Sequence, residues 1–131
     1  MGLSGSVAFA TTLLNAANAY RAAGKSDRSL ELYGQVFVIY EKELPRDDMY
    51  LANLYNNISL VYQEIQNYEK AKEALLKALA ICKANENTGF EIAVTHANLA
   101  NTCIWLKEDE DAMEHAMVAV RMFEQQHVED A

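Results

Sequence analysis

The sequence is poor in cysteine, with only Cys82 and Cys103 among its 131 residues. Two cysteines without the spacing of a metal site exclude a disulfide framework and favour a reducing compartment, so we expect a cytoplasmic protein. The chain also lacks a long hydrophobic run. Its longest notable one, at 36–40, is far short of the ~20 apolar residues that cross a bilayer. These absences predict a protein with neither disulfides nor a membrane-spanning segment.

Basic residues are scarce as well, since 11 Lys and Arg stand against 19 Asp and Glu, for a net charge of −8. Nucleic acids and anionic membranes attract basic surfaces, so we expect neither as a partner. Gly2 and Ser6 fit a myristoylation pattern, but that pattern is short and common, and we expect a plain loop there. Half of the residues are apolar, and the length suits one domain or one short repeat array.

The side chains that usually carry out catalysis occur in no recognisable arrangement. His96, His115 and His127 are far apart in the sequence, and no pattern of a nucleophile, a phosphate-binding loop or a metal site is present. We therefore expect no enzymatic activity, no cofactor and no bound metal. His96 is expected to be partly buried and satisfied by a partner. Cys103 is expected to be a small core residue and not a nucleophile.

What the sequence does contain is a regular arrangement of small and bulky residues across 55–79. The small residues occur where two helices of a hairpin would approach closely, and the bulky ones where gaps would need filling. The positions are Tyr55, Ile58, Ser59, Tyr62, Ala71, Leu75 and Ala78. This stretch resembles a tetratricopeptide repeat, although Gln66 replaces the usual turn glycine and Lys83 the usual terminal proline.

The same pattern recurs on both sides of this stretch. Moving 42 residues back from Asn57 reaches Asn15, and moving 41 residues forward reaches Asn98. The predicted repeats span about 7–44, 48–85 and 89–127. We therefore predict an all-α fold, a right-handed superhelix of three tetratricopeptide hairpins with six antiparallel helices. The long spacing resembles that of kinesin light chain repeats, and this resemblance implies an interaction scaffold with no chemistry of its own.

Local residue preferences predict where the helices begin and end. The expected helices are 7–23, 28–43, 48–65, 68–84, 89–106 and 109–125. Gly24 suits the left-handed residue that follows a helix. The predicted N-caps are Ser26 or Asp27, then Asp47 or Asp48, then Asn67, and then Thr88 in a capping box with Glu91.

In a stack of such hairpins the first helices line a concave groove. The side chains expected in that groove are Asn15, Asn18, Arg21, Asn53, Asn56, Asn57, Leu60, Gln63, Asn98, Asn101 and Trp105. Asn15, Asn57 and Asn98 share one repeat position, and an amide can pair with both the donors and the acceptors of a peptide backbone. The resemblance implies peptide contact at these three residues, so we expect the partner to be a protein or an extended peptide segment. The alternative is that each amide bonds the neighbouring hairpin.

Two of the predicted groove residues indicate which ligands the groove would accept. Arg21 is the only cation predicted there, so a C-terminal carboxylate is a poor candidate ligand. Trp105 is either an anchor for a ligand or a cover for the exposed end of the array.

A second function class depends on the last predicted helix. Met113, Met117 and Val120 add an apolar stripe beside the expected core stripe, whereas a terminal repeat normally carries a polar face. The alternative function is therefore self-assembly into a homo-oligomer, or membership of a longer array, through this end interface.

Overall fold

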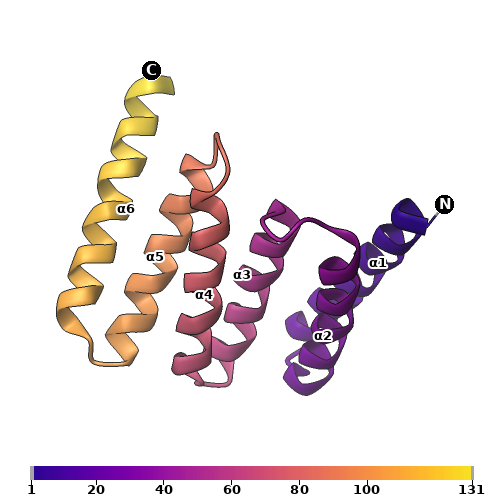
Figure 1. Cartoon of the computed structure of the whole chain (residues 1–131). Helices are drawn as coiled ribbons and strands as arrows, with labels where there is room; N and C mark the ends of the chain where they lie inside the picture. Colours follow the sequence, from indigo (N-terminus) through magenta and orange to yellow (C-terminus); the bar gives the residue numbers. More distant parts are fainter. Residues whose placement is uncertain (1, 131) are drawn as a thin grey trace.

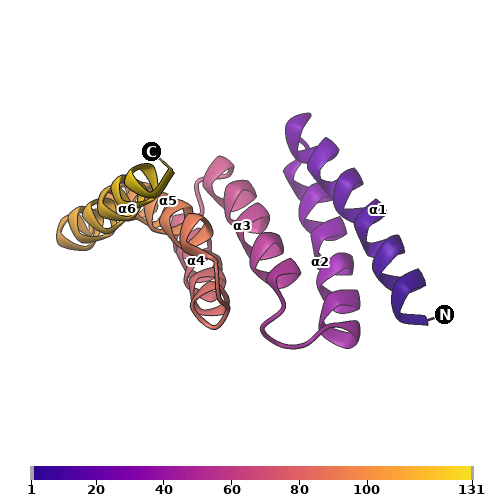
Figure 2. The same ribbon diagram turned by 90° about the horizontal axis from the view of Figure 1, so that it is seen from above.

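The computed structural model describes residues 2–130, and the side chains of residues 6–127. Within them lie six helices and no strand, namely α1 (Gly2–Ala22), α2 (Ser26–Glu43), α3 (Met49–Glu64), α4 (Tyr68–Lys83), α5 (Gly89–Trp105) and α6 (Asp109–Asp130). They pair as three hairpins that stand in a row, with α1 and α2 at one end and α6 at the other (Figure 1). Seen from above, the helix axes turn along the row (Figure 2). The predicted all-α superhelix of hairpins is confirmed.

The two outermost helices are longer than the sequence predicted. The loop expected around Gly2 and Ser6 is wrong, because α1 already begins at Gly2. No proline interrupts this stretch, and extending an existing helix backwards costs little once its first turn has formed. At the other end, α6 continues to Asp130 and so passes its predicted end at 125.

Each hairpin turns through one residue in the left-handed conformation, Gly24 (φ 78°), Gln66 (φ 64°) or Lys107 (φ 65°). In the first hairpin the next amide, that of Lys25, donates to the carbonyl of Tyr20 at 2.8 Å. The corresponding bonds, at 2.8 and 2.9 Å, close α3 and α5, which is the Schellman arrangement. The predicted role of Gly24 is confirmed, and Gln66 adopts the conformation that glycine usually supplies.

Two of the predicted N-caps are present and two are not. The cap expected at Ser26 or Asp27 is wrong, because α2 already begins at Ser26 and its N-cap, Lys25, forms no side-chain hydrogen bond there. The carboxylate of Asp48 accepts the amide of residue 50 at 2.9 Å, and the side chain of Asn67 accepts that of residue 70 at 3.3 Å. The capping box at Thr88 is wrong, because its hydroxyl donates to the Cys82 carbonyl at 2.6 Å. The buried hydroxyl therefore satisfies the last turn of α4 and leaves the start of α5 without a side-chain cap.

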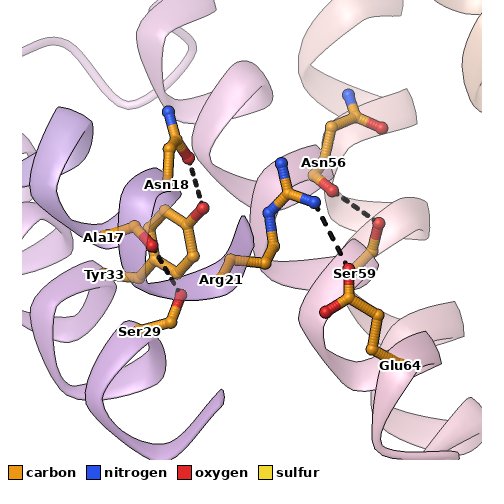
Figure 3. Close-up of polar contacts among 8 residues, drawn as sticks. All are labelled: Ala17, Asn18, Arg21, Ser29, Tyr33, Asn56, Ser59 and Glu64. Carbon is orange, nitrogen blue, oxygen red and sulfur yellow. Dashed lines mark hydrogen bonds and ion pairs between the residues drawn. The ribbon is translucent and has the colours of Figure 1, made fainter. Parts of the chain in front are cut away.

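Small residues lie where the helices touch, as predicted. Ser59, Ala71 and Ala78 are fully buried. In the first hairpin the Ser29 hydroxyl donates to the Ala17 carbonyl at 2.9 Å, so α2 approaches the main chain of α1 directly (Figure 3). Only residues with short side chains allow two helices to approach this closely.

Neighbouring hairpins are joined by apolar contacts. Leu51, Leu54 and Val61 of α3 belong to the buried cluster of the first hairpin. Leu79 of α4 packs with Leu99 of α5 in a second cluster. The first helix of each hairpin therefore packs on the second helix of the hairpin before it, and this leaves the other face of α1, α3 and α5 for a site. None of the described helices combines the length and apolar character needed to span a bilayer.

Candidate functional site

A hollow of about 440 Å³ lies between α3 and α5 on the face that was predicted to bind. It is lined by Asn53, Asn56, Asn57, Leu60, Phe90, Glu91, Val94 and Asn98. The structure thus brings five of the predicted groove residues together in one place. Of the remaining six, Gln63, Asn101 and Trp105 lie on the same two helices outside this hollow, and the other three lie on α1.

Phe90 and Glu91 were missed by the sequence reasoning. Both belong to the first turn of α5, and the ring of Phe90 is 61% exposed. They precede Val94 by four and three residues, respectively, and therefore extend the groove stripe of α5 by one helical turn. Continuing that stripe back to the helix start would have identified them.

The groove asparagines fall into two groups by the hydrogen bonding of their side chains. Asn18, Asn56 and Asn101 each make a side-chain hydrogen bond within the protein. In residues 6–127, no side-chain hydrogen bond is formed by the other four, which are Asn15, Asn53, Asn57 and Asn98. Their donors and acceptors are therefore open to solvent or to a ligand.

Asn18 and Asn101 share another repeat position, and both form hydrogen bonds within the protein. The amide oxygen of Asn18 accepts the Tyr33 hydroxyl within the first hairpin. Asn101 donates from Nδ2 to Oε1 of Gln63 at 3.3 Å, which joins α5 to α3. Only the amide of Asn101 therefore bonds a neighbouring hairpin, whereas that of Asn18 bonds within its own.

Arg21 reaches from α1 to α3. Its Nη1 lies 3.3 Å from Oε1 of Glu64, and Figure 3 shows the side chain extending between the Asn18–Tyr33 pair and α3. The two side chains are 25% and 44% exposed, so the pair lies at the edge of the groove and not deep within it. The only cation of the predicted groove is thus already paired with a carboxylate.

Three buried polar atoms have no hydrogen-bond partner among the described residues. They are Nε of Arg21, Oδ1 of Asn56 and Nε2 of Gln63. All three belong to side chains that the sequence placed in the groove. A buried polar group without a partner costs about 1–3 kcal/mol, so folded proteins keep few of them unless a water or a ligand satisfies them.

Trp105 stacks on Tyr68, the first residue of α4. The ring centroids are 5.3 Å apart and the planes are tilted by 3°. The indole remains 59% exposed. Trp105 therefore joins the ends of two hairpins outside the hollow between α3 and α5, and its role towards a ligand remains a prediction.

His96 is buried against α6, as predicted, but its partner was not foreseen. Its Nδ1 lies 2.9 Å from Nδ1 of His115. Burial lowers the pKa of His96, and the charges of His115 and Lys83 lower it further. Two adjacent imidazoles share such a bond only while at least one of them is neutral. No group of three or more metal-ligating side chains forms in the part of the chain that the structure describes.

Cys103 is fully buried, as predicted. Burial raises the pKa of its thiol, which disfavours the reactive thiolate. The prediction of a small core residue is confirmed.

A larger hollow, about 550 Å³, lies between α2, α3 and α4. Its walls include Phe37, Leu51 and Tyr55, which continue the apolar seam between the first two hairpins. None of the three buried polar atoms without a partner lies in it. The hollow between α3 and α5 is therefore the stronger candidate in spite of its smaller size.

Comparison with known proteins agrees with this architecture. A tetratricopeptide repeat family model matches two overlapping stretches, residues 8–84 and 50–125. No curated protein matches the sequence at a significant level. BtubC (BKLC) from P. vanneervenii has a similar structure, with a TM-score of 0.86 and 20% identity over 90% of this chain and 48% of that one. The present chain thus spans about half the length of BtubC.

Two shorter structures are similar over most of their length. The second TPR domain of Spaghetti (RPAP3), bound to the HSP90 peptide SRMEEVD, gives a TM-score of 0.67 at 18% identity, over 86% of this chain and 91% of that one. The N-terminal domain of STI-1 from C. elegans gives 0.75 at 14% identity, over 90% and 87%. These likenesses concern the fold. The sequence match extends over nearly all of the three hairpins, and the chain belongs to the tetratricopeptide repeat family.

Proposed function

We propose that this protein is a non-enzymatic scaffold that binds an extended protein segment along the face shared by α1, α3 and α5. The observation that carries the proposal is the set of three unpaired buried polar atoms on that face, on Arg21, Asn56 and Gln63. Unpaired groups in a folded protein need an explanation, and a ligand that supplies the missing partners is one. One of the three, Asn56, lines the hollow between α3 and α5, and this supports a binding site over a packing defect there.

The amides of the groove suit the main chain of a ligand. Asn57 lies in the central hairpin and Asn98 in the next, and both line the hollow. An extended segment presents alternating donors and acceptors, and each free amide can pair with both. Such pairing gives affinity without reading the sequence of the ligand.

The apolar residues of the hollow would bind a side chain of the ligand and so provide specificity. Leu60, Val94 and the exposed ring of Phe90 line it together with one carboxylate, Glu91. This combination favours an apolar anchor next to a neutral or basic residue. An acidic C-terminus is disfavoured, because Arg21 is neutralised by Glu64.

Several finer properties belong to the same proposal. The long repeat spacing supports a kinesin-light-chain-like subtype, and the scarcity of cysteine supports a cytoplasmic location. The net charge of −8 supports protein partners over nucleic acid or membranes. Catalysis and cofactors have no place in this scheme, because the groove offers binding groups only.

A displayed library of random linear peptides, selected on the intact chain, tests the proposal. Selected peptides should lose affinity about 5- to 150-fold for Asn57→Ala, which corresponds to one unpaired partner at about 1–3 kcal/mol. The melting temperature should stay unchanged, because alanine favours helix and the amide has no partner in the protein. Gln35→Ala, an exposed amide on α2, is the matched control and should bind like the wild type.

Two outcomes would count against the groove. Selected peptides that bind Asn57→Ala and Asn98→Ala as tightly as the wild type would place binding elsewhere. A lower melting temperature with unchanged affinity in the folded fraction would make the amides structural.

A further inference from the structure

The hollow of about 550 Å³ between α2, α3 and α4 has an apolar floor and a charged mouth. The floor consists of buried or half-buried side chains from the seam between the first two hairpins, namely Phe37, Leu44, Leu51, Tyr55 and Ile81. Small-molecule sites are typically about 300–1,000 Å³ in volume, and combine apolar walls with a few polar groups that orient the ligand. The hollow therefore has the size and the lining of a small-molecule site.

The connection between α2 and α3 forms one rim of this hollow. Pro45 disfavours a helical conformation at Leu44, whose backbone is extended (φ −116°, ψ 153°), so the chain leaves α2 in a wide arc (Figure 2). The arc is tied to the end of α4, because Nδ2 of Asn85 donates to the Asp47 carbonyl at 2.8 Å. The rim is therefore fixed before a ligand arrives, and this lowers the cost of ordering it on binding.

The corresponding residues of the next seam are more deeply buried. A shift of 42 residues places Phe37 on Leu79, and a shift of 41 residues places Tyr55 on His96. Leu79 and His96 are each 7% exposed. Phe37 and Tyr55 are only half-buried, and their rings meet edge to face with centroids 5.7 Å apart. This aromatic pair is therefore a property of the first seam and does not follow from the stacking of hairpins alone.

The mouth of the hollow carries two cations and one carboxylate, on Arg46, Lys77 and Glu41. Arg46 is exposed, and it forms no ion pair with any other side chain of residues 6–127. Lys77 lies 4.0 Å from a carboxylate oxygen of Glu73, and both side chains are more than half exposed, so this pair is weak. The mouth therefore has a surplus of positive charge in a chain whose net charge is −8.

Tyr55 adds a neutral donor between the floor and the mouth. Its ring lies beneath the ammonium group of Lys77, with Nζ 5.7 Å from the ring centroid. Burial raises the pKa of the Tyr55 phenol, and the negative charge of Glu41 raises it further, so the hydroxyl keeps its proton. A carboxylate only accepts hydrogen bonds, and its bonds to cations are the strong ones. A phenol beside two cations therefore suits a carboxylate ligand.

We propose that this hollow binds a small amphipathic carboxylate, with its apolar body against Leu51 and Ile81 and its carboxylate between Arg46 and Lys77. The floor favours an apolar body, and the surplus of positive charge at the mouth favours an anionic head group. Glu41 offsets one of the two cations, so the mouth complements a single negative charge and disfavours a dianion.

This site and the proposed peptide groove lie on different sides of α3. Leu51 and Tyr55 are four residues apart and line the hollow with α2 and α4. Asn53, Asn57 and Leu60 line the other hollow with α5. The two ligands would therefore not displace each other, and the proposal is tested independently of the function proposed for the groove.

Isothermal titration calorimetry of the intact chain with decanoate, kept below its micelle concentration, tests the proposal. Decanoate should bind saturably at one site per chain. Decyltrimethylammonium has the same apolar chain with the opposite charge and should bind more weakly, and acetate, which lacks an apolar body, should not bind. Methyl NMR should show the largest shifts at Leu51 and Ile81, and none at Met113 and Val120, which are exposed on α6.

Charge variants at the mouth should act in opposite directions. Arg46→Gln and Lys77→Gln should each weaken decanoate binding about 2- to 5-fold, as is usual for exposed charges. Glu41→Gln should strengthen it by a similar factor, and all three effects should reverse for decyltrimethylammonium. Lys42→Gln removes an exposed cation of α2 that does not line the hollow, and this control should leave the affinity unchanged.

Ala80→Phe should fill the hollow. Ala80 of α4 lines it and is exposed, so a larger side chain there displaces no buried residue. This variant should no longer bind decanoate saturably, although its melting temperature should not fall. Leu76→Phe introduces the same ring at an exposed position of α4 outside the hollow, and this control should bind like the wild type.

Each of three results would overturn the proposal. Absence of saturable decanoate binding would exclude this class of ligand and leave the hollow to a side chain of a protein partner. Equal affinity for decanoate and decyltrimethylammonium would show that the charges at the mouth select nothing. Undiminished binding by Ala80→Phe, or shifts confined to Met113 and Val120, would place decanoate on another surface.

Discussion

Arg21 of α1 and Glu64 of α3 form an ion pair across the first two hairpins, with Nη1 and Oε1 3.3 Å apart. The pair joins two hairpins and at the same time cancels the charge of the only cation predicted in the groove. Since both side chains are partly exposed, its contribution to stability is small, about 0–1 kcal/mol. Its larger effect is on ligand binding, because a ligand would contact a neutral ion pair instead of a free guanidinium.

Glu64→Gln should make the groove accept acidic peptides. Removing the carboxylate frees the Arg21 guanidinium, so affinity for an acidic heptapeptide should rise about 2- to 5-fold, as expected for a charge at a partly exposed site. Fluorescence anisotropy with the labelled peptide measures this at low salt. Glu31→Gln, which removes a similar ion pair with Arg28 on α2, is the control and should leave the affinity unchanged. Equal affinity of the wild type and Glu64→Gln would mean that Arg21 does not face the ligand.

The turns of the second and third hairpins should be stabilised by glycine. Gln66 and Lys107 have φ values of 64° and 65°, a conformation that costs a side chain about 1 kcal/mol and glycine much less. Gln66→Gly and Lys107→Gly should each raise the free energy of unfolding by about 0.5–1 kcal/mol. Urea denaturation followed by circular dichroism measures the change.

Gly24→Ala is the reverse experiment. A Cβ at Gly24 would meet no atom within 4 Å, so the variant changes only the backbone preference at φ 78°. It should lower the free energy of unfolding by about 1 kcal/mol. If the glycine variants destabilise the protein instead, the turns owe their shape to side-chain contacts of Gln66 and Lys107.

Stability should fall in mild acid because of the buried imidazole of His96. Its pKa is lowered in the folded state, so below its ordinary value near 6.5 the unfolded chain binds a proton that the folded chain resists. The stabilising effect is complete above pH 6.5 and decreases as the pH falls towards the folded pKa. Between about pH 7.5 and 5.5 we therefore expect the free energy of unfolding to decrease, as measured by urea denaturation at a series of pH values.

His96→Leu tests that assignment. Leu13 occupies the same repeat position in the first hairpin, so leucine fits the pattern of the site. Denaturant unfolding of this variant should depend less on pH in the same range. Lys83 and Glu114 also act on His96, and a profile identical to that of the wild type would assign the pH dependence to groups other than His96.

The repeat pattern determined which parts of this structure the sequence could predict. Ser59 and Ala71 were placed correctly, because the close helix contacts that bury them lie within one hairpin and recur at a fixed spacing. The His96–His115 pair was missed because it depends on the register of two antiparallel helices, which spacing along the chain does not specify. Thr88 was misassigned because its hydroxyl can bond either the following helix start or a preceding carbonyl, and only the folded connection decides.

Asn56→Leu should make the protein more stable and bind more weakly. Oδ1 of Asn56 is buried without a partner among the described residues, and Nδ2 bonds only the Ala52 carbonyl of its own helix, at 3.2 Å. Leu14 holds the same repeat position in the first hairpin, so the site tolerates leucine. Removing the unsatisfied oxygen should raise the free energy of unfolding by about 1 kcal/mol, measured by urea denaturation.

The same substitution separates a functional amide from a packing defect. If a ligand supplies the partner of Oδ1, peptides selected on the wild type should bind Asn56→Leu about 5- to 150-fold more weakly while the protein itself is more stable. Asn53→Leu changes an exposed amide in the same hollow, and its stability should stay within about 0.5 kcal/mol of the wild type. A more stable Asn56→Leu that binds the peptides unchanged would remove Asn56 from the site. A less stable one would mean that the oxygen has a partner in the unliganded protein, such as an ordered water, and the main argument for the groove would then fail.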